Sequence, residues 1–131
     1  MRIEAFLSQP SVAATPADVS VGDDLLETLK AHSGHCVGMA ANMIGAKKRI
    51  IAIETDDGHL VMYNPQIVQR SQPYETEEGC LSLDGVRPTT RYQRITVTWQ
   101  DRDFATHTKK FAGWRAQIIQ HEVDHCDGIL I

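Results

Sequence analysis

The sequence predicts an α+β fold. Two patterns predict this class: segments typical of strands occupy the middle of the chain, and helical patterns flank them. The length of 131 residues is that of one domain with one sizeable core, so residues 1–131 are expected to form a single domain.

The N-terminal part contains the first predicted helix. Residues 1–22 include Pro10 and Pro16 and are expected to be irregular. Asp23 or Asp24 is expected to cap a helix that ends near His32 and presents three leucines on one side, namely Leu25, Leu26 and Leu29.

Strand patterns follow in the middle of the chain. A turn is expected at residues 56–58, and alternation in the last third predicts a buried strand face carrying Ile95, Val97 and Trp99. Gly113 is expected to open the last helix and Gly128 to end it. The predicted strands cover residues 49–54, 59–64, 66–70, 91–100 and 106–111.

Composition excludes several classes of protein. Hydrophobic residues make up 42% and charged residues 23% of the chain, which is typical of a globular protein rather than a disordered one. The formal net charge of −4 argues against direct nucleic-acid binding and against binding to an anionic membrane. No apolar run approaches a membrane span or a signal peptide, so a cytoplasmic location is expected.

The clearest chemical signal is the segment His121-Glu122-Val123-Asp124-His125, an HExxH motif. Helical spacing of four places both imidazoles on one face, where each can offer a nitrogen to one metal ion. Glu122 lies beside the pair, where its carboxylate can act on water. Only six residues follow His125, and the position of a metzincin-type third histidine holds Ile131, so a third ligand must come from upstream.

Several upstream residues are candidates for that ligand. Cys126 is disfavoured, because it follows His125 directly and points about 100° away around the helix. Cys80 is favoured, because it lies in a glycine-containing segment where the backbone can approach a ligand. An inert buried thiol is the alternative for Cys80. The other candidates are several carboxylates and Cys36, His32, His35, His59 and His107.

Three segments, taken in order, resemble the three motifs of the peptide deformylase family. Residues 38–45 (GMAANMIG) are similar to the first motif, residues 78–82 match EGCLS, and residues 120–125 match QHExDH. The resemblance covers about residues 35–131 and implies a peptide deformylase-like domain, with small mixed or antiparallel β-sheets around the C-terminal HExxH helix. It also implies a role in N-terminal processing during protein biosynthesis. It implies that Cys80, His121 and His125 bind one divalent metal ion, Fe²⁺ in the native protein, which Zn²⁺, Ni²⁺ or Co²⁺ can replace.

The resemblance also implies a mechanism. Glu122 activates a water for attack on the formyl carbon and then protonates the leaving amine, while the backbone N–H of Leu81 holds the oxyanion. The substrate is an N-formyl-methionyl peptide or nascent chain, met near the ribosome, which lies beside Val37, Gly38 and Gly79. An apolar pocket for its methionine is expected near Trp114 and Ile118.

Two positions depart from the family pattern. Met43 stands where the family has a glutamine that donates a hydrogen bond to the oxyanion, and a thioether cannot donate. Reduced activity is therefore expected. Cys36 stands where the family has glycine. These departures leave two alternatives open: action on another N-formyl or N-acyl substrate, or metal and peptide binding without turnover.

Overall fold

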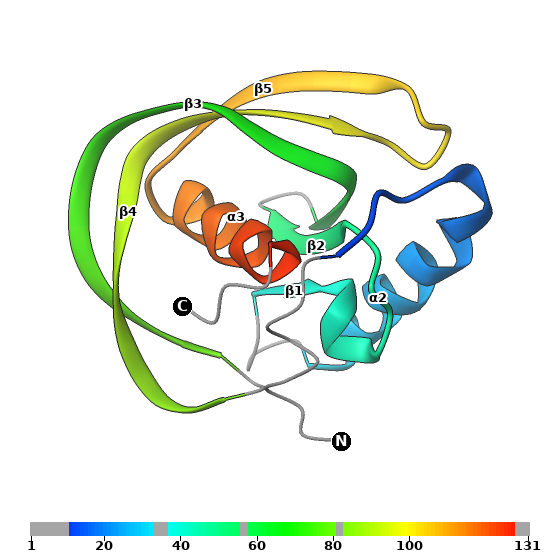
Figure 1. Ribbon diagram of the computed structural model, residues 1–131, viewed down its shortest axis with the longest axis horizontal. Helices are drawn as coiled ribbons and strands as arrows, with labels where there is room; N and C mark the ends of the chain where they lie inside the picture. The colour runs from blue at the N-terminus through cyan, green and yellow to red at the C-terminus, as the bar shows by residue number, and fades with distance from the viewer. Residues whose placement is uncertain (1–10, 33–36, 56–57, 81–82, 128–131) are drawn as a thin grey trace.

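An antiparallel sheet wrapped around one helix dominates the structure (Figure 1). The computed structural model describes residues 11–32, 37–55, 58–80 and 83–127, without the side chains of residues 79–87. The combination of an antiparallel sheet with helices confirms the predicted α+β class. The described elements are η1 (Pro16–Asp18), α2 (Val19–Ala31), β1 (Gly38–Ala40), η2 (Ala41–Ile44), β2 (Ile50–Thr55), β3 (Gly58–Cys80), β4 (Leu83–Gln100), β5 (Thr106–Ala112) and α3 (Gly113–Cys126).

The described strands form a single sheet in the order β1-β2-β3-β4-β5, and every neighbouring pair is antiparallel. The short strand β1 is therefore an edge strand, aligned on β2 with Gly38 opposite Ile53. Each strand follows its neighbour along the chain, as expected when connections are short.

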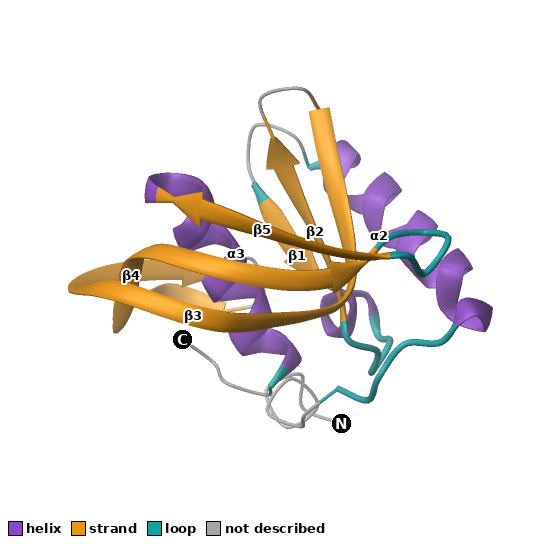
Figure 2. Ribbon diagram, turned by 90° about the horizontal axis from the view of Figure 1, so that it is seen from above, coloured by secondary structure: helices purple, strands orange, loops and turns teal. Residues whose placement is uncertain are grey.

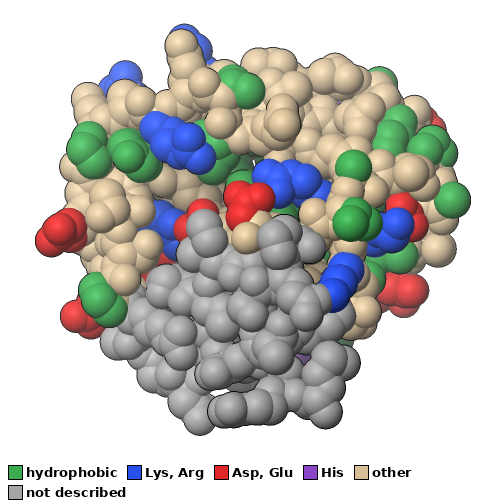
Figure 3. Space-filling view, in the orientation of Figure 1, with side chains coloured by type: hydrophobic (Ala, Val, Ile, Leu, Met, Phe, Trp, Pro, Cys, Tyr) green, Lys and Arg blue, Asp and Glu red, His purple; other side chains and the backbone are tan. Residues whose placement is uncertain are grey.

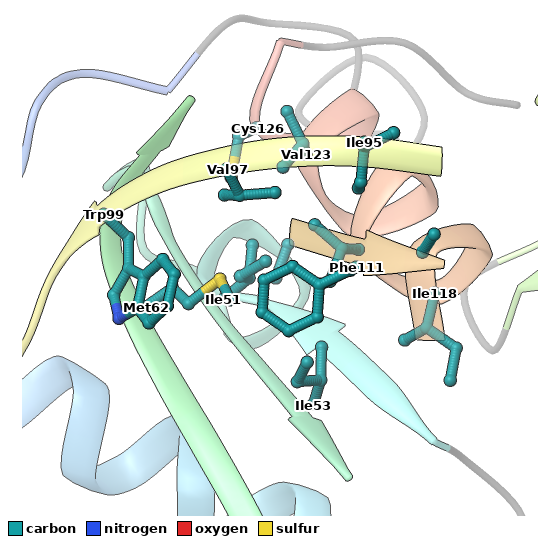
Figure 4. Packing of buried hydrophobic residues seen from close by; sticks show 13 residues of the cluster. Ile51, Ile53, Met62, Ile95, Val97, Trp99, Phe111, Ile118, Val123 and Cys126 are labelled. Atoms are coloured by element: carbon teal, nitrogen blue, oxygen red, sulfur yellow. The ribbon is translucent and has the colours of Figure 1, made fainter. Parts of the chain in front are cut away.

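The strand β2 is buried on both faces and divides the core in two. Ile51 and Ile53 belong to a cluster with α3, whereas Ile50 and Ala52 belong to a second cluster with α2. Figures 1 and 2 show the two helices on opposite sides of β1 and β2. Burial on both faces explains the uninterrupted apolar run in this strand. Figure 4 shows the first cluster, to which β2 contributes Ile53, β5 contributes Phe111 and α3 contributes Ile118.

The two longest strands curve around α3. Register shifts in the β3–β4 pairing lie between Tyr63 and Gln66, between Ile67 and Gln69, and between Gly79 and Cys80. Bulges of this kind bend a strand and increase its twist. At the first of them Asn64 has φ of 53°, and its side chain bonds the backbone of Ala14 and the side chain of Gln100.

One strand replaces two that the sequence predicted. Separate strands were expected at 59–64 and 66–70, but β3 continues through this bulge to Cys80. The paired extensions beyond Arg70 were missed because most of their described side chains are exposed and polar, so they lack an apolar alternation.

The first described α-helix begins earlier than predicted. The N-terminal cap was expected at Asp23 or Asp24, but α2 begins at Val19, directly after η1. The Thr15 N–H donates to the Asp18 carboxylate at 2.8 Å, and Pro16 occupies the first helical position. Thr-Pro-Ala-Asp is thus the true helix-start signal. Leu25 and Leu29 are fully buried as predicted, while Leu26 is half-buried.

The remaining predicted elements correspond to β2, β4, β5 and α3, and the buried alternation of Ile95, Val97 and Trp99 is confirmed. Of the turn predicted at residues 56–58, only Gly58 is described, and it is the first residue of β3. Residues 56–57 and the predicted helix stop at Gly128 lie outside the described residues. No helix within the described ranges combines the length and apolarity needed to cross a membrane. On the face in Figure 3, basic and acidic side chains are interspersed.

Candidate active site

The helix α3 carries the HExxH motif and is enclosed by the sheet. Among the residues between Ala116 and Cys126, only Gln117 and Asp124 are not buried. Its partners are β1 and β2 on one side and the curved β3–β4 pair on the other (Figure 1). A helix buried on most sides places its polar residues in the interior, where each of them needs a partner.

The imidazoles of His121 and His125 face each other on one side of this helix. Their Nε2 atoms are 3.2 Å apart, and the two rings form an edge contact with centroids 4.8 Å apart. His125 is fully buried and His121 nearly so. Two nitrogens bound at about 2.0–2.1 Å to one tetrahedral ion lie about 3.3 Å from each other, so the observed separation fits two ligands of one divalent ion.

Glu122 lies beside the imidazole pair. Its Oε2 atom is 4.0 Å from Nε2 of His121, and donor atoms of His121, Glu122 and His125 all lie within 4.8 Å of one another. Gly38 in β1 allows this placement, because a Cβ atom there would lie 3.1 Å from both Cγ and Oε2 of Glu122. The buried edge strand thus packs its backbone directly against the carboxylate.

Glu78 in β3 forms a hydrogen bond with Nδ1 of His121, the ring nitrogen that faces away from His125. Its Oε1 atom is 2.8 Å from His121 Nδ1, and Gln117 and Arg91 also donate to this carboxylate. Burial acts to raise the pKa of Glu78, but the hydrogen bonds from His121, Arg91 and Gln117 outweigh it and lower that pKa to about 2. Glu78 is therefore a carboxylate at neutral pH, and it fixes the orientation of the His121 ring.

Two amide side chains hold the helix to its neighbours. Gln120 donates to the carbonyl of Tyr92 at 2.9 Å and accepts from the N–H of the same residue at 2.8 Å. Asn42 in η2 donates to the carbonyl of His125 at 2.8 Å. The first-motif segment and β4 are thereby tied to the helix that carries the histidines.

Met43 follows Asn42 in η2, but its side chain packs with apolar residues and donates no hydrogen bond. Its sulfur accepts the backbone N–H of Ala40 at 3.4 Å, and its side chain packs against both core clusters. The thioether therefore has a structural role, and it offers no hydrogen-bond donor.

The structure places the other predicted site residues as follows. Gly79 and Cys80 are the last two residues of β3, with Gly79 opposite Val86. Leu81 lies outside the described residues, as do His35 and Cys36. The Val37 carbonyl accepts the N–H of Glu54. In the expected methionine pocket, Ile118 is buried whereas Trp114 is 62% exposed.

The remaining candidate ligands interact elsewhere. His32 bonds the Thr28 carbonyl, His59 lies near Glu54, and His107 is paired with Asp101. Burial raises the pKa of the Cys126 thiol to about 12, consistent with a core residue. Within the described parts of the chain, the donor cluster consists of His121, Glu122 and His125.

Arg91 is a buried residue beside the site that was not predicted from the sequence. It lies on the strand face that also carries Ile95 and Val97, and only 3% of its surface is exposed. Burial acts to lower the pKa of Arg91, but hydrogen bonds to Glu78 and Asp124 raise it. The available signal was that Arg91 shares the alternation of the buried Ile95 and Val97, because a buried charge requires partners.

A helix-borne HExxH pair with an adjacent buried glutamate, enclosed by an antiparallel sheet, defines a metal-dependent hydrolase. The chain belongs to the polypeptide deformylase family, which matches residues 6–131. Its activity is the removal of the formyl group from an N-terminal methionine, and the family is metal-dependent.

Both the curated relatives and the solved structures that resemble this chain are peptide deformylases. The chain is 53% identical over 126 residues to a peptide deformylase of Clostridium beijerinckii, covering 96% of this chain and 93% of that protein. The peptide deformylase structure from Thermus thermophilus matches with a TM-score of 0.86 and 32% identity, covering 99% of this chain and 80% of that one. The Met-Ala-Ser-bound class I type b peptide deformylase of Acinetobacter baumannii matches with a TM-score of 0.85 and 26% identity, covering 96% of this chain and 90% of that one.

The contact between Gly38 and Glu122 predicts the effect of Gly38→Ala. The added methyl group meets Ile118 at 2.8 Å and the Glu122 side chain at 3.1 Å, so the carboxylate must move. Turnover should fall by about 10–10² while bound metal is retained, because small displacements of reacting groups are costly. Formate release and metal content measure this.

Met39→Leu is the matched control, since Met39 lies in the same strand but belongs to the cluster with α2. It should leave formate release unchanged. Full activity of Gly38→Ala would show that β1 does not set the position of Glu122.

Proposed function

We propose that the chain hydrolyses N-formyl-methionyl peptides at one divalent metal ion held by Cys80, His121 and His125. The observation that carries this proposal is the convergence of the two Nε2 atoms beside the Glu122 carboxylate. Cys80 is supported as the third ligand by its position, since it follows Glu78, the partner of His121, by two residues.

We propose Fe²⁺ as the native ion, as the resemblance to peptide deformylases implies, with Zn²⁺, Ni²⁺ or Co²⁺ as replacements. Two imidazoles and one thiolate can bind each of these ions. When bound, such an ion supplies a Lewis acid that polarises the formyl oxygen and makes water more acidic.

Glu122 is the proposed general base and acid. It is buried beside the imidazole pair, so it can take a proton from the attacking water and then deliver a proton to the leaving amine nitrogen. Formate and a free N-terminus result. The backbone N–H of Leu81 is the proposed donor to the oxyanion.

The proposed peptide groove follows the edge of the sheet. The edge strand β1 offers a place where an extended peptide can add as a further strand, beside Val37 and Gly38 and close to Gly79. The methionine side chain is proposed to lie near Ile118 and Trp114. The proposed substrates are newly made chains, which places the reaction in the cytoplasm near the ribosome.

Glu122→Gln tests the acid and base assignment. The amide keeps the shape of the side chain but cannot carry the proton, so formate release from an N-formyl-Met tripeptide should fall by about 10²–10⁴. The protein is loaded with Fe²⁺ without oxygen, and metal content should be unchanged. Glu27→Gln, at an exposed position of α2, is the control. Activity that survives in Glu122→Gln would show that another group carries the proton.

Cys80→Ala tests the third ligand. Because the thiolate is lost, the bound metal should fall from one equivalent to a small fraction after desalting, as measured by elemental analysis. Cys126→Ala is the matched control, since Cys126 is a buried core thiol, and it should retain the metal. Full occupancy in Cys80→Ala would exclude Cys80 as a ligand.

Met43→Gln tests the missing oxyanion donor. An amide at this position restores a side-chain donor, and one such donor contributes about 10²–10³ in rate, so kcat should rise at least about tenfold. Met43→Leu, which also lacks a donor, should match the parent protein. No increase in kcat for Met43→Gln would show that the rate does not depend on a donor at this position.

A further inference from the structure

We propose that Arg91 is a positioning residue for the metal centre, which it serves by clamping the Cys80-bearing end of β3 and the histidine-bearing helix α3 through two carboxylates. This inference rests on the proposed function, because it assigns the metal to Cys80, His121 and His125.

The guanidinium joins three elements of the fold. Arg91 belongs to β4, and its Nε and Nη2 atoms donate to Oε1 of Glu78 in β3 at 3.0 and 2.6 Å. Its Nη1 atom donates to Asp124 in α3. The planar fork of arginine can serve two carboxylates at once in fixed directions, which a lysine ammonium cannot do.

The first branch of the clamp reaches His121. Glu78 receives the guanidinium, and its Oε1 atom also lies 2.8 Å from Nδ1 of His121. By contrast, in the described part of the chain Nδ1 of His125 is buried without a hydrogen-bond partner. The Glu78 carboxylate therefore orients one imidazole of the pair, and Arg91 orients the carboxylate.

The same branch holds the backbone near the proposed third ligand. Glu78 precedes Cys80 by two residues in β3, which is a distance of about 7 Å along a strand. A fixed Glu78 side chain thus restrains the end of β3, where a register shift separates Gly79 from Cys80.

The second branch reaches the helix between the two histidines. Asp124 lies directly before His125 and three residues after His121, and it is half-buried against the guanidinium. Arg91 therefore sets the distance between the strand that carries Cys80 and the helix that carries both imidazoles.

Stability alone does not account for this arrangement. Removing a cation and two carboxylates from water is costly, and apolar residues of similar volume often fill such a space equally well. A rigid, directional link between two ligand-bearing segments is what the charged cluster provides and an apolar cluster would not.

The test is Arg91→Lys loaded with Co²⁺, whose visible absorption spectrum reports the ligand geometry. Lysine keeps the charge but loses the fork, so the Co²⁺ spectrum should change and the dissociation constant should rise about 10–100-fold. Competition with a chelator measures the constant. Arg49→Lys is the matched control, because the Arg49 side chain pairs with Asp127, the cap residue after α3, at 2.6 Å and donates to the Pro65 carbonyl, away from the site residues that the structure describes. It should keep the parent spectrum.

Asp124→Asn serves as a second variant if Arg91→Lys does not fold, since it weakens only the helix branch and should also alter the spectrum. A folded Arg91→Lys protein with the parent spectrum and dissociation constant would overturn the positioning role. Absence of Co²⁺ binding by the parent protein would instead overturn the proposed function, so the two failures are distinguishable.

Discussion

The structure depends on one buried interaction, the hydrogen-bonded ion pair between Arg91 and Glu78. It joins β4 to β3 in the interior, and through His121 it reaches the helix that the sheet encloses. A buried carboxylate is tolerated only when its hydrogen-bonding capacity is filled, and Glu78 accepts from Arg91, Gln117 and His121. The curvature of β3 and β4 makes this possible, because it carries both strands around α3.

Enclosing α3 within the sheet also gives its reactive side chains the surroundings that a metal-dependent hydrolase needs. A metal-dependent hydrolase needs imidazoles whose free nitrogens converge and a carboxylate held close by in a water-poor setting. The helix supplies all three groups within five residues. Because Gly38 has no side chain, the backbone of the edge strand can pack directly against Glu122. The same edge strand is where we propose that an extended peptide pairs. The buried polar residues of α3 thus bring the three reactive groups together.

Part of this design was predictable from sequence, and part was not. Local patterns predicted the HExxH helix, the apolar strand β2 and the alternation of Ile95, Val97 and Trp99, because periodicity records burial directly. The long β3–β4 extension was not predicted, since its described side chains are mostly exposed and polar. The pairing of Arg91 with Glu78 spans 13 residues and depends on strand register, which no local pattern states. The early start of α2 was missed although Thr15-Pro16 signalled it.

X-ray absorption at the zinc edge of the Zn²⁺-loaded protein tests whether Cys80 and the two histidines bind one ion. We expect one sulfur at about 2.3 Å and two imidazole nitrogens at about 2.0–2.1 Å, with a further light atom completing the shell. Ligation by nitrogen and oxygen alone would contradict it, because the end of β3 would then contribute no thiolate to the site that the buried ion pair is proposed to assemble.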